Sequence, residues 1–461
     1  MIPIEKVKSV FFIGIGGIGM SALARYLNTK NIKVSGYDKT ETQLTKKLVS
    51  EGIDIHYQDE IENIPTDIDL VVYTPAIPKN HKQFNYLLDS GIPVVKRAKL
   101  LGLMTERHKL IAVAGTHGKT TTSAMVSYLA IQCDIKVTAF LGGIAHAFDS
   151  NFIDGDSEWM VAEADEYDRS FLSLIPVISV VNSVDADHLD IYGTESAILE
   201  SFAEFMCRTK PGGHLIIPSE VERKLTPEIR ENLSAKKVKV VSFGSENSEV
   251  IYSNVGVEGA SYTFDYEYEG FKLQHLKLGM PGIHNLKNMV AAITAVLLTG
   301  SASIARIPDA VSAFSGIKRR FELVWDGKIK YIDDYAHHPT ELEATISSAK
   351  MMYPEKKVLG VFQPHLFSRT RDFYKGFAEA LDELDEVILL PIYPARELPM
   401  EGVESEMIAG EMKNENVKVV PFDKLIEELK NRKFDVLLTL GAGDIDLHVN
   451  EIKAWLKYEQ Y

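Results

Sequence analysis

A short segment in the middle of the chain has the residue types of a phosphate-binding loop. It follows the apolar run Lys109–Ala114, precedes a helical stretch, Thr122–Ile131, and reads Gly115-Thr116-His117-Gly118-Lys119-Thr120-Thr121. Backbone N–H groups in such a loop surround phosphates, a lysine neutralises their charge and a hydroxyl reaches Mg²⁺. The last two roles fall to Lys119 and Thr120. The strict spacing places glycine where Val113 stands, so this loop is a shortened form, and a chance match is the alternative.

Metal ligands are expected at the ends of two further predicted strands. The candidates are Glu163, in the run A-E-A-D-E, and His188, in the run D-A-D-H-L-D. Carboxylates suit Mg²⁺, whereas a histidine ligand for Mg²⁺ is less usual because imidazole suits softer metals. Mn²⁺ is kept as an alternative to Mg²⁺. Each residue also has a plain structural interpretation, with Glu163 as a solvated acid at a strand end and His188 as a histidine bonded to backbone.

A second glycine-rich turn lies near the N-terminus. It joins a predicted strand, Val7–Ile15, to a predicted helix, Ser21–Thr29, and reads Gly14-Ile15-Gly16-Gly17-Ile18-Gly19. The glycines let the backbone approach a diphosphate, and the helix N-terminus adds partial positive charge. Asp38 follows Gly19 by 19 residues, at the end of the next predicted strand. Three interpretations stay open: a UDP-linked ligand, NAD with Asp38 on its ribose, and a tight structural turn.

Short apolar strands alternate with amphipathic helices almost throughout the 461 residues, which predicts an α/β protein with parallel sheets. At roughly 150 residues per domain, the length predicts three domains. We expect a Rossmann-like N-terminal domain (1–105), a central P-loop mononucleotide-binding α/β domain (106–320) and a C-terminal Rossmann-like α/β domain (321–461). Polar and apolar residues alternate with period two over Val250–Leu278, so a small antiparallel β portion belongs to the central domain.

Histidines and arginines of the third domain lie near the edge where doubly wound sheets bind ligands. Pro339 favours a helix start, so His337 and His338 lie beside a helix N-terminus, which favours an anion such as a carboxylate or acyl phosphate. A helix cap without a ligand is the alternative. Bidentate arginines suit the carboxylate of an amino acid, and the three candidates, each alternatively a plain surface charge, are Arg369, Arg371 and Arg396.

The composition excludes several classes of protein. Hydrophobic residues make up 45% and charged residues 25%, which excludes a disordered chain. A formal net charge of −15 disfavours general binding to nucleic acid or to an anionic membrane. The two cysteines cannot form a disulfide framework, which fits a reducing compartment. The uncharged run Ser9–Ala24 superficially resembles a signal peptide but holds four glycines, so we expect a cytoplasmic protein.

Taken in order, the motifs resemble those of the Mur ligase family. They cover the chain from Gly14 to about Asp444 and read G-I-G-G-I-G-M-S-A, G-T-H-G-K-T-T-T, A-E-A-D-E, A-D-H-L-D, H-N-L-K-N, R-R-F-E and D-D-Y-A-H-H-P-T-E. The resemblance implies a UDP-substrate domain, an ATP domain and an amino-acid domain. It implies that ATP phosphorylates the lactyl carboxylate of UDP-N-acetylmuramate and that the amine of L-alanine attacks the acyl phosphate.

The same resemblance implies roles for individual residues. It assigns Thr120, Glu163 and His188 to Mg²⁺. ATP contacts would come from the loop Gly115, Thr116, His117, Gly118, Lys119, Thr120 and Thr121, from Asn285 and Asn288 at the adenine, and from Arg320 and Asp334. Substrate contacts would come from Gly16, Gly17, Ile18, Asp38, Thr74, His365, Arg371 and Arg396. Catalytic roles would fall to Lys119, His337, His338 and Arg369.

Some alternatives remain open within this picture. Many relatives read P-H-R where this chain has Pro364-His365-Leu366, so Leu366 removes an arginine from the contacts to the substrate carboxylate. A sister ligase that attaches a preformed peptide would use the same phosphate chemistry. An NAD-dependent oxidoreductase would leave the P-loop unexplained, and a non-enzymatic ATP switch would leave the H-N-L-K-N and D-D-Y-A-H-H-P segments unexplained. The oligomeric state is not predicted.

Overall fold

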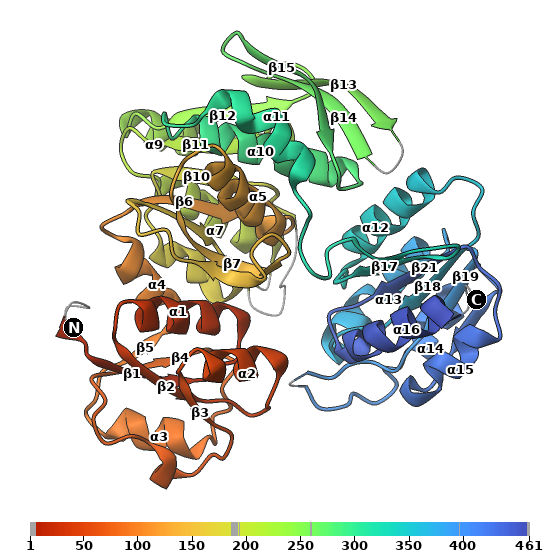
Figure 1. The fold of residues 1–461 in the computed structure, drawn as a ribbon, viewed down its shortest axis with the longest axis horizontal. Coiled ribbons are helices and arrows are strands. Elements are labelled where there is room, and N and C mark those ends of the chain that lie inside the picture. The colour runs from red at the N-terminus through yellow and green to blue at the C-terminus, as the bar shows by residue number, and fades with distance from the viewer. Residues whose placement is uncertain (1–5, 186–191, 193, 259–260, 396, 459–461) are drawn as a thin grey trace. The chain divides into compact units, whose positions relative to one another are not determined.

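The computed structural model describes residues 6–185, 192, 194–258, 261–395 and 397–458, and it contains three β-sheets flanked by helices (Figure 1). The chain divides into two compact units. One holds the first sheet and most of the second, and the other holds the third sheet with short pieces of the second. Each unit is described by itself.

The first sheet is parallel, with strand order β3-β2-β1-β4-β5. Its strands are β1 (Ser9–Ile13), β2 (Lys33–Tyr37), β3 (Asp54–His56), β4 (Leu70–Tyr73) and β5 (Val94–Lys96). Residues Val10–Ile13 are fully buried, as expected for a strand covered on both faces. One face carries α1 (Ile18–Thr29), α2 (Gln43–Ser50) and α4 (Arg97–Thr105), and the other carries α3 (Lys82–Asp89).

The second sheet has ten strands in the order β15-β14-β13-β12-β11-β10-β6-β9-β7-β8. Its first part consists of β6 (Lys109–Ala114), β7 (Thr138–Ala145), β8 (Ser150–Ile153), β9 (Trp159–Glu163), β10 (Ile178–Val181), β11 (His214–Pro218) and β12 (Lys239–Gly244). The pairs from β12 through β7 are parallel, and β7–β8 is antiparallel. The helices of this part are α5 (Lys119–Gln132), α7 (Glu195–Cys207), α8 (Ser219–Glu222), α9 (Pro227–Ala235), α10 (Ile283–Leu297) and α11 (Ile307–Ala313).

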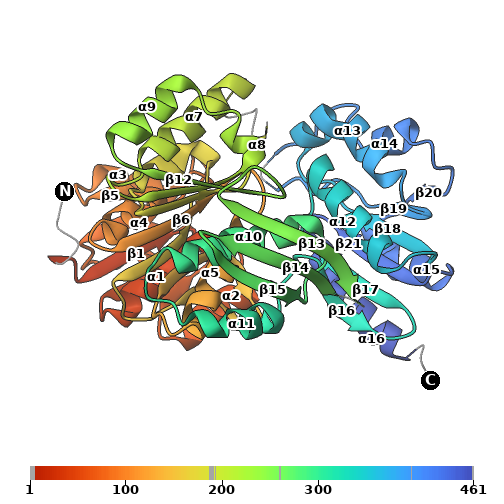
Figure 2. The ribbon, with the colours of Figure 1, turned by 90° about the horizontal axis from the view of Figure 1, so that it is seen from above.

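The period-two segment forms the three strands β13 (Val250–Glu258), β14 (Ser261–Tyr268) and β15 (Phe271–Leu278), which lie side by side (Figure 2). Successive strands joined by only two residues must run antiparallel, which confirms the predicted antiparallel portion.

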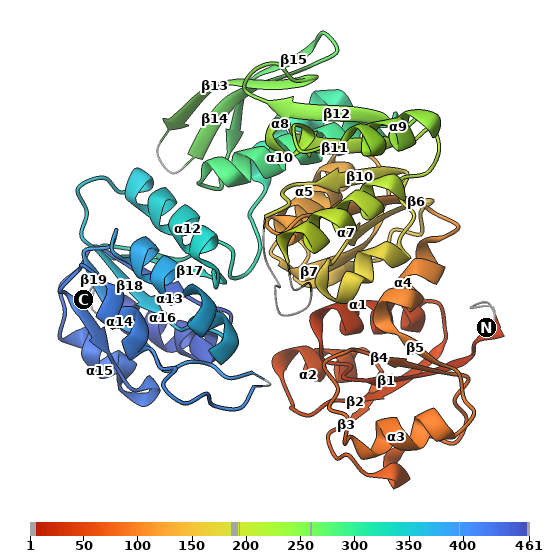
Figure 3. The same cartoon turned by 180° about the vertical axis from the view of Figure 1, so that it is seen from behind.

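The third sheet has the order β16-β17-β21-β18-β19-β20 and is parallel except for β16. Its strands are β16 (Glu322–Asp326), β17 (Lys330–Asp334), β18 (Val358–Phe362), β19 (Glu386–Leu389), β20 (Val417–Val419) and β21 (Val436–Leu440). One face packs against α12 (Pro339–Met352), α13 (Phe367–Leu381) and α14 (Glu406–Glu411), and the other against α15 (Leu425–Lys430) and α16 (Val449–Tyr458) (Figure 3).

Two helices begin earlier than the sequence pattern predicts. Helix α1 begins at Ile18 rather than Ser21, and α5 begins at Lys119 rather than Thr122. Glycine and threonine have low helix propensity, so the pattern places them outside the helix, but the tight glycine turns fix their backbone in helical geometry. The last residues of both phosphate-binding candidates, Ile18 and Gly19 in one and Lys119 to Thr121 in the other, therefore lie in a first helical turn, where N–H groups lack intrahelical acceptors. No helix in the described ranges is long and apolar enough to cross a membrane.

Candidate functional site

The phosphate-loop candidate connects β6 to α5 and contains two glycines whose backbone φ angles are positive. Gly115 has φ +136° and Gly118 has φ +77°. A Cβ on Gly118 would lie 2.6 Å from Oδ1 of Asn288, and a Cβ on Gly115 would lie 3.0 Å from the backbone N of Ser183. Both positions therefore require glycine, for the backbone angle and for the close approach of neighbouring groups.

Side chains that follow β10 hold the loop in place. The hydroxyl of Ser183 accepts a hydrogen bond from the backbone N of His117 (2.9 Å) and lies 2.8 Å from Oγ1 of Thr116. Asn182 donates from Nδ2 to Oγ1 of Thr122 (2.8 Å). The sequence motif contained no signal for Asn182 or Ser183, because they are brought to the loop by the parallel pairing of β10 with β6.

Lys119 is the buried cation of this loop. Its ammonium donates to the carbonyl O of Gly115 (2.7 Å) and to Oε1 of Glu166 (2.8 Å), whose side chain is 2% exposed. Burial disfavours the ammonium, but the nearby carboxylates of Glu166, Glu163 and Asp165 outweigh burial and raise the pKa of Lys119 above its usual value. Lys119 is therefore a permanent positive charge at the N-terminus of α5, where the helix adds further attraction for anions.

Thr120 and Glu163 meet beside this cation. The hydroxyl of Thr120 donates to Oε2 of Glu163 (2.7 Å) from the next residue of α5, and Glu163 ends β9, which pairs with β6. A hydroxyl and a carboxylate beside a phosphate loop are oxygen donors of the kind that bind Mg²⁺ together with substrate phosphates. The described ranges contain no cluster of three or more His, Cys, Asp or Glu arranged for a metal, and His188 lies outside them.

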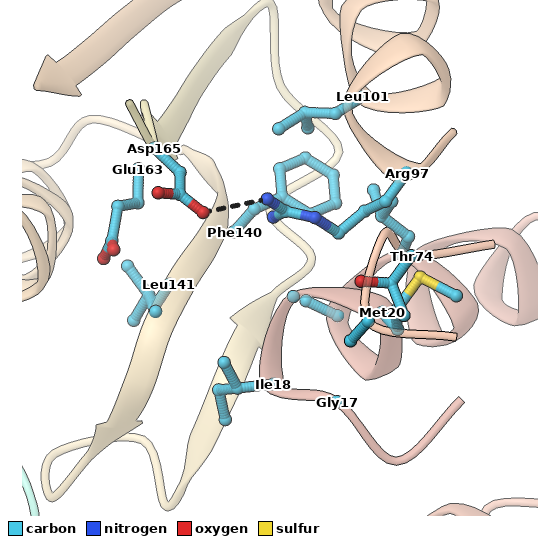
Figure 4. Close-up of a pocket in the computed structure, with 15 residues that line it drawn as sticks. Gly17, Ile18, Met20, Thr74, Arg97, Leu101, Phe140, Leu141, Glu163 and Asp165 are labelled. Carbon is cyan, nitrogen blue, oxygen red and sulfur yellow. Dashed lines mark hydrogen bonds and ion pairs between the residues drawn. The ribbon is translucent and has the colours of Figure 1, made fainter. Parts of the chain in front are cut away.

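A cavity of about 310 Å³ lies between the N-terminal glycine turn and the end of β9, where Glu163 lies (Figure 4). Gly17, Ile18 and Thr74 line it from the first sheet's side, and Leu141 and Glu163 line it from the second. Four residues predicted separately from the sequence, three as substrate contacts and one as a metal ligand, thus share one cavity.

An arginine that the sequence interpretation missed points into the same cavity. Arg97, at the start of α4, pairs with Asp165 across it (3.2 Å, Figure 4). A Cβ on Gly19 would lie 2.6 Å from Nη1 of Arg97, so the glycine turn leaves room for the guanidinium. Arg97 falls in a charged segment that resembles a domain boundary, and only Asp165, inside the A-E-A-D-E motif, carried a sequence signal.

Asp38 lies at the N-terminal turn as expected, but it bonds to protein backbone. Its Oδ2 accepts from the backbone N of Gly16 (2.7 Å) and its Oδ1 from that of Thr40 (3.2 Å). A Cβ on Gly16 would lie 2.8 Å from Oδ2. The carboxylate fixes the glycine turn, and a contact from Asp38 to a ribose stays a prediction.

The two asparagines of α10 are both buried. Asn285 is 3% exposed and donates from Nδ2 to the carbonyl O of Pro281 (2.7 Å), whereas Asn288, 7% exposed, faces Gly118. Asn288 therefore contacts the phosphate loop itself. Recognition of adenine by this helix stays a prediction.

In the second unit, Asp334 ends β17 and is buried. Its Oδ2 accepts from the backbone N of Phe321 (2.6 Å) and its Oδ1 from that of Ala336 (2.7 Å). Burial raises the pKa of Asp334 to about 6, although Arg320 opposes this shift. The Arg320 guanidinium lies 5.1 Å from the centre of the Tyr335 ring and 3.9 Å from Glu341, so this arginine is partly neutralised and partly stacked.

The neighbouring arginine has a different surrounding. Arg319 donates from Nε to Oδ2 of the buried Asp333 (3.0 Å) and from Nη2 to the carbonyl O of Gly441 (2.6 Å). Thr439 donates to the other oxygen of Asp333 (2.6 Å). Arg319 therefore holds the loop after β21, whereas Arg320 lies beside Glu341 and the Tyr335 ring. The sequence alone does not show this difference.

His337 and His338 lie at the start of α12 as predicted, in different surroundings. Nδ1 of His337 lies 2.9 Å from the carbonyl O of Tyr335 and 3.2 Å from Glu341, so we assign its proton to Nδ1. Burial lowers the pKa of His337 to about 4, although Glu341 opposes this shift. His338 is the N-cap residue, is 7% exposed, and packs edge-on against Phe373 (4.8 Å between ring centres).

The remaining predicted residues of this unit divide into three groups. The ring of His365 stacks on Tyr393 (5.7 Å) and lies 6.0 Å from that of His337, and Arg369 is close enough to affect the pKa of His337. Arg371 points to the surface, where it pairs with Asp372 (2.8 Å), and Arg396 lies outside the described residues. Leu366, the residue in place of the relatives' arginine, has φ +72°, which is strained for a branched side chain.

Known proteins resemble this chain over nearly all of its length. The Mur ligase family catalytic-domain model matches residues 9–109, the Mur ligase middle-domain model residues 113–296, and the Mur ligase glutamate-ligase-domain model residues 319–443. UDP-N-acetylmuramate–L-alanine ligase of Cytophaga hutchinsonii is 45% identical over 462 residues, covering 98% of this chain and 97% of the relative. The same-named protein of Flavobacterium johnsoniae is 45% identical, covering 98% and 99%.

Solved structures show the same similarity. UDP-N-acetylmuramate–alanine ligase of Thermotoga maritima has a TM-score of 0.82 at 28% identity, covering 98% of this chain and 99% of that one. A murein peptide ligase of Psychrobacter arcticus has a TM-score of 0.70 at 23% identity, covering 97% and 98%, and shares the fold.

Lys119→Met should abolish nucleotide-dependent turnover. It removes the buried ammonium at the phosphate loop, and we expect ATP-dependent phosphate release to fall by at least about 10²-fold. Phosphate release and the melting temperature are measured together, because the change also removes the partner of Glu166. Lys136→Met, at an exposed lysine of the same unit, is the control. A folded Lys119→Met protein that retains turnover would remove Lys119 from the mechanism.

His337 should titrate far below the usual range for histidine. Its folded pKa of about 4 lies below the ordinary value of 6.5. Its neutral form therefore contributes stability that is fully present above pH 6.5 and is lost as the pH falls towards 4. Ring chemical shifts of wild type and His337→Gln, followed by NMR from pH 8 to pH 4, assign the titration. An inflection near pH 6.5 for this ring would contradict the structure.

Proposed function

The chain belongs to the Mur ligase family, and we propose that it uses ATP to join L-alanine to the lactyl carboxylate of UDP-N-acetylmuramate. The reaction releases ADP and phosphate and contributes a precursor of peptidoglycan. The observation that carries the assignment is the identity of 45% with relatives of this name over 98% of the chain. The phosphate loop, the acid at its edge and the cavity that reaches the N-terminal glycine turn provide the chemistry that this reaction needs.

Three domains with the boundaries 1–105, 106–320 and 321–461 follow from this assignment. We propose that the first binds the UDP-linked substrate, the second ATP and the third L-alanine. Each boundary lies beside a motif that one domain contributes, with Lys109–Ala114 leading into the phosphate loop and Arg319–Arg320 leading into β16.

The ATP phosphates would bind at the loop from Gly115 to Thr121. Backbone N–H groups at the start of α5 and the ammonium of Lys119 would face the transferred phosphoryl group. A carboxylate and a triphosphate are both anionic, so the first task of the site is to hold them together. Lys119 is already charged and held, which means that no reorganisation cost is added when the phosphates arrive.

The family is ATP-dependent and uses a divalent metal, and we propose Mg²⁺, with Mn²⁺ as a substitute. Thr120 and Glu163 fit such an ion, because they place a hydroxyl and a carboxylate oxygen 2.7 Å apart beside the phosphate loop. His188 would be a third ligand, as the family resemblance implies. When bound, the ion would offset the charge of the phosphates.

The acid substrate would occupy the cavity of Figure 4. Its diphosphate would lie at the turn of Gly16, Gly17 and Ile18, with Asp38 and Thr74 at the turn's edge, and its lactyl carboxylate would extend towards Glu163 and Lys119. Arg97 adds a guanidinium to this path. Its ion pair with Asp165 avoids an unpaired charge in the cavity. A substrate anion would take the place of the Asp165 carboxylate as the partner of Arg97.

The third domain would bind L-alanine and activate its amine. We propose that His337 or His338 takes the proton from the ammonium group; in His337 the accepting nitrogen would be Nε2, because Nδ1 is bonded to Tyr335, but its pKa of about 4 makes it a weak base. His365 and Arg369 lie in the same neighbourhood and would contact the substrate, as would Arg396. Arg371 pairs with Asp372 at the surface and is the weakest of the proposed contacts. His338, Arg320 and Asp334 keep the roles that the resemblance implies.

We propose that the reaction takes place in the cytoplasm, where ATP and UDP-linked precursors are available. No nucleic acid or membrane partner is proposed, in keeping with the net charge of −15.

Amino-acid-dependent ADP release tests the function directly. With UDP-N-acetylmuramate and ATP present, L-alanine should give the highest kcat/KM among the common amino acids, and the product mass should increase by one alanine residue. Omitting UDP-N-acetylmuramate should abolish ADP release. Turnover with a preformed tripeptide in place of alanine would assign the sister activity, and reduction of NAD with either substrate would assign the dehydrogenase.

Glu163→Gln should raise the Mg²⁺ concentration required for half-maximal activity by about 10-fold or more, because an amide is a weaker ligand than a carboxylate. The change is nearly isosteric and leaves an oxygen to accept from Thr120. Glu158→Gln, at the exposed partner of Lys109 just before the same strand, is the matched control and should leave the Mg²⁺ dependence unchanged. An unaltered dependence in Glu163→Gln would exclude Glu163 as a ligand.

A further inference from the structure

One fully buried asparagine links the second sheet to the helix that follows the N-terminal glycine turn. Asn151 lies on β8 and has no exposed surface. Its Nδ2 donates to the carbonyl O of Ile18 (2.6 Å) and to the hydroxyl of Ser21 (2.9 Å), and its Oδ1 accepts from Nη1 of Arg25. All three partners belong to α1.

The three partners fix α1 in both rotation and axial position. Ile18, Ser21 and Arg25 follow one another at spacings of three and four, so they share one face of the helix. Ile18 accepts a hydrogen bond through its carbonyl and Arg25 donates one through its guanidinium, and the single amide of Asn151 pairs with both. Arg25 is 5% exposed and also donates from Nε to Glu51 (2.7 Å), so its guanidinium is fixed in position.

Apolar packing beside this contact is less specific. Tyr26 of α1 packs against Phe140 and Phe152 of the β7–β8 hairpin, with ring centres 5.5 and 6.2 Å away. Such contacts tolerate sliding, whereas buried polar atoms lose their partners when an element shifts. The amide therefore specifies the position of α1 against β8 more sharply than the aromatic contacts do.

The position of α1 matters because its first turn forms a wall of the cavity. Ile18 accepts a hydrogen bond from Asn151 through its backbone and lines the cavity beside Gly17, facing the wall that contains Leu141 and Glu163 (Figure 4). Asn151 itself does not line the cavity. A shift of α1 would change the distance between the glycine turn and Glu163.

We propose that Asn151 is a positioning residue for the ligation, setting the separation between the glycine turn that would bind the diphosphate and the site of phosphoryl transfer at Thr120 and Glu163. The inference rests on the proposed function, because it requires one substrate to reach from the turn to that site. Asn151 acts through Ile18 and α1 and does not touch substrate.

Asn151→Asp removes the two donations of Nδ2, to Ile18 and to Ser21, and keeps the contact to Arg25. A carboxylate still accepts from Arg25 but cannot donate, and it places an oxygen against the carbonyl of Ile18. We expect the KM for UDP-N-acetylmuramate to rise by about 5- to 10-fold, because α1 loses the hydrogen bonds from Nδ2 that hold it, with kcat falling less. The KM values for ATP and L-alanine should stay within about 2-fold of wild type, since neither substrate bridges the two walls.

Two further variants complete the test. Asn151→Ser is uncharged and too short to bridge Ile18 and Arg25, so it should raise the same KM and remains informative if the aspartate variant fails to fold. Asp149→Asn, on the turn before β8, weakens the exposed contact to Lys47 (3.0 Å) and should match wild type. Melting temperatures are recorded for each, and kinetics are measured well below the lowest.

The outcomes separate the inference from the function on which it depends. Wild-type KM for UDP-N-acetylmuramate in both folded Asn151 variants would overturn the inference and leave the function intact. An equal rise in all three KM values would also overturn it, because that is the signature of a general loss of structure. Absence of alanine ligation by the wild-type protein would overturn the function and the inference together.

Discussion

The charge balance around Lys119 is the constraint on which the rest of the site depends. Its ammonium is bonded to Gly115 and Glu166, and Glu163 and Asp165 lie near enough to hold its pKa high. Burying opposite charges together adds little net stability, because desolvation offsets their attraction. The arrangement instead keeps one cation at a fixed place before an anionic substrate arrives, which is where preorganised charge is most effective in catalysis.

The same principle recurs at each sheet edge. Loops at the carboxyl ends of parallel strands expose backbone groups that need partners, and in this protein a side chain from a neighbouring element provides them. Ser183 holds the phosphate loop, Asp38 holds the N-terminal glycine turn, and Arg319 holds the loop after β21. Each of these contacts fixes the shape of its turn.

Asn151 extends this principle from single loops to whole elements. A ligase that phosphorylates a nucleotide-linked acid must keep a fixed distance between the site that binds the nucleotide and the site of phosphoryl transfer. A buried amide between α1 and β8 specifies the separation more sharply than aromatic packing does, because its partners are lost when either element slides. The ion pair of Arg97 with Asp165 joins the same two walls at the cavity itself.

The sequence determined the features that depend on local rules. Glycine spacing, strand–turn–helix periodicity and the alternation over Val250–Leu278 were enough for the α/β class, the two glycine-rich turns and the antiparallel strands. Tertiary structure alone decided which distant residues meet these turns: Glu166 at Lys119, Arg97 across the cavity, Asn151 at Ile18. It also decided that Arg319 bonds to Asp333 and to the loop after β21, while Arg320 lies beside Glu341. The reason is physical, because strand order and helix packing set these contacts and the burial that shifts the pKa of His337, and neither is encoded within a short stretch of chain.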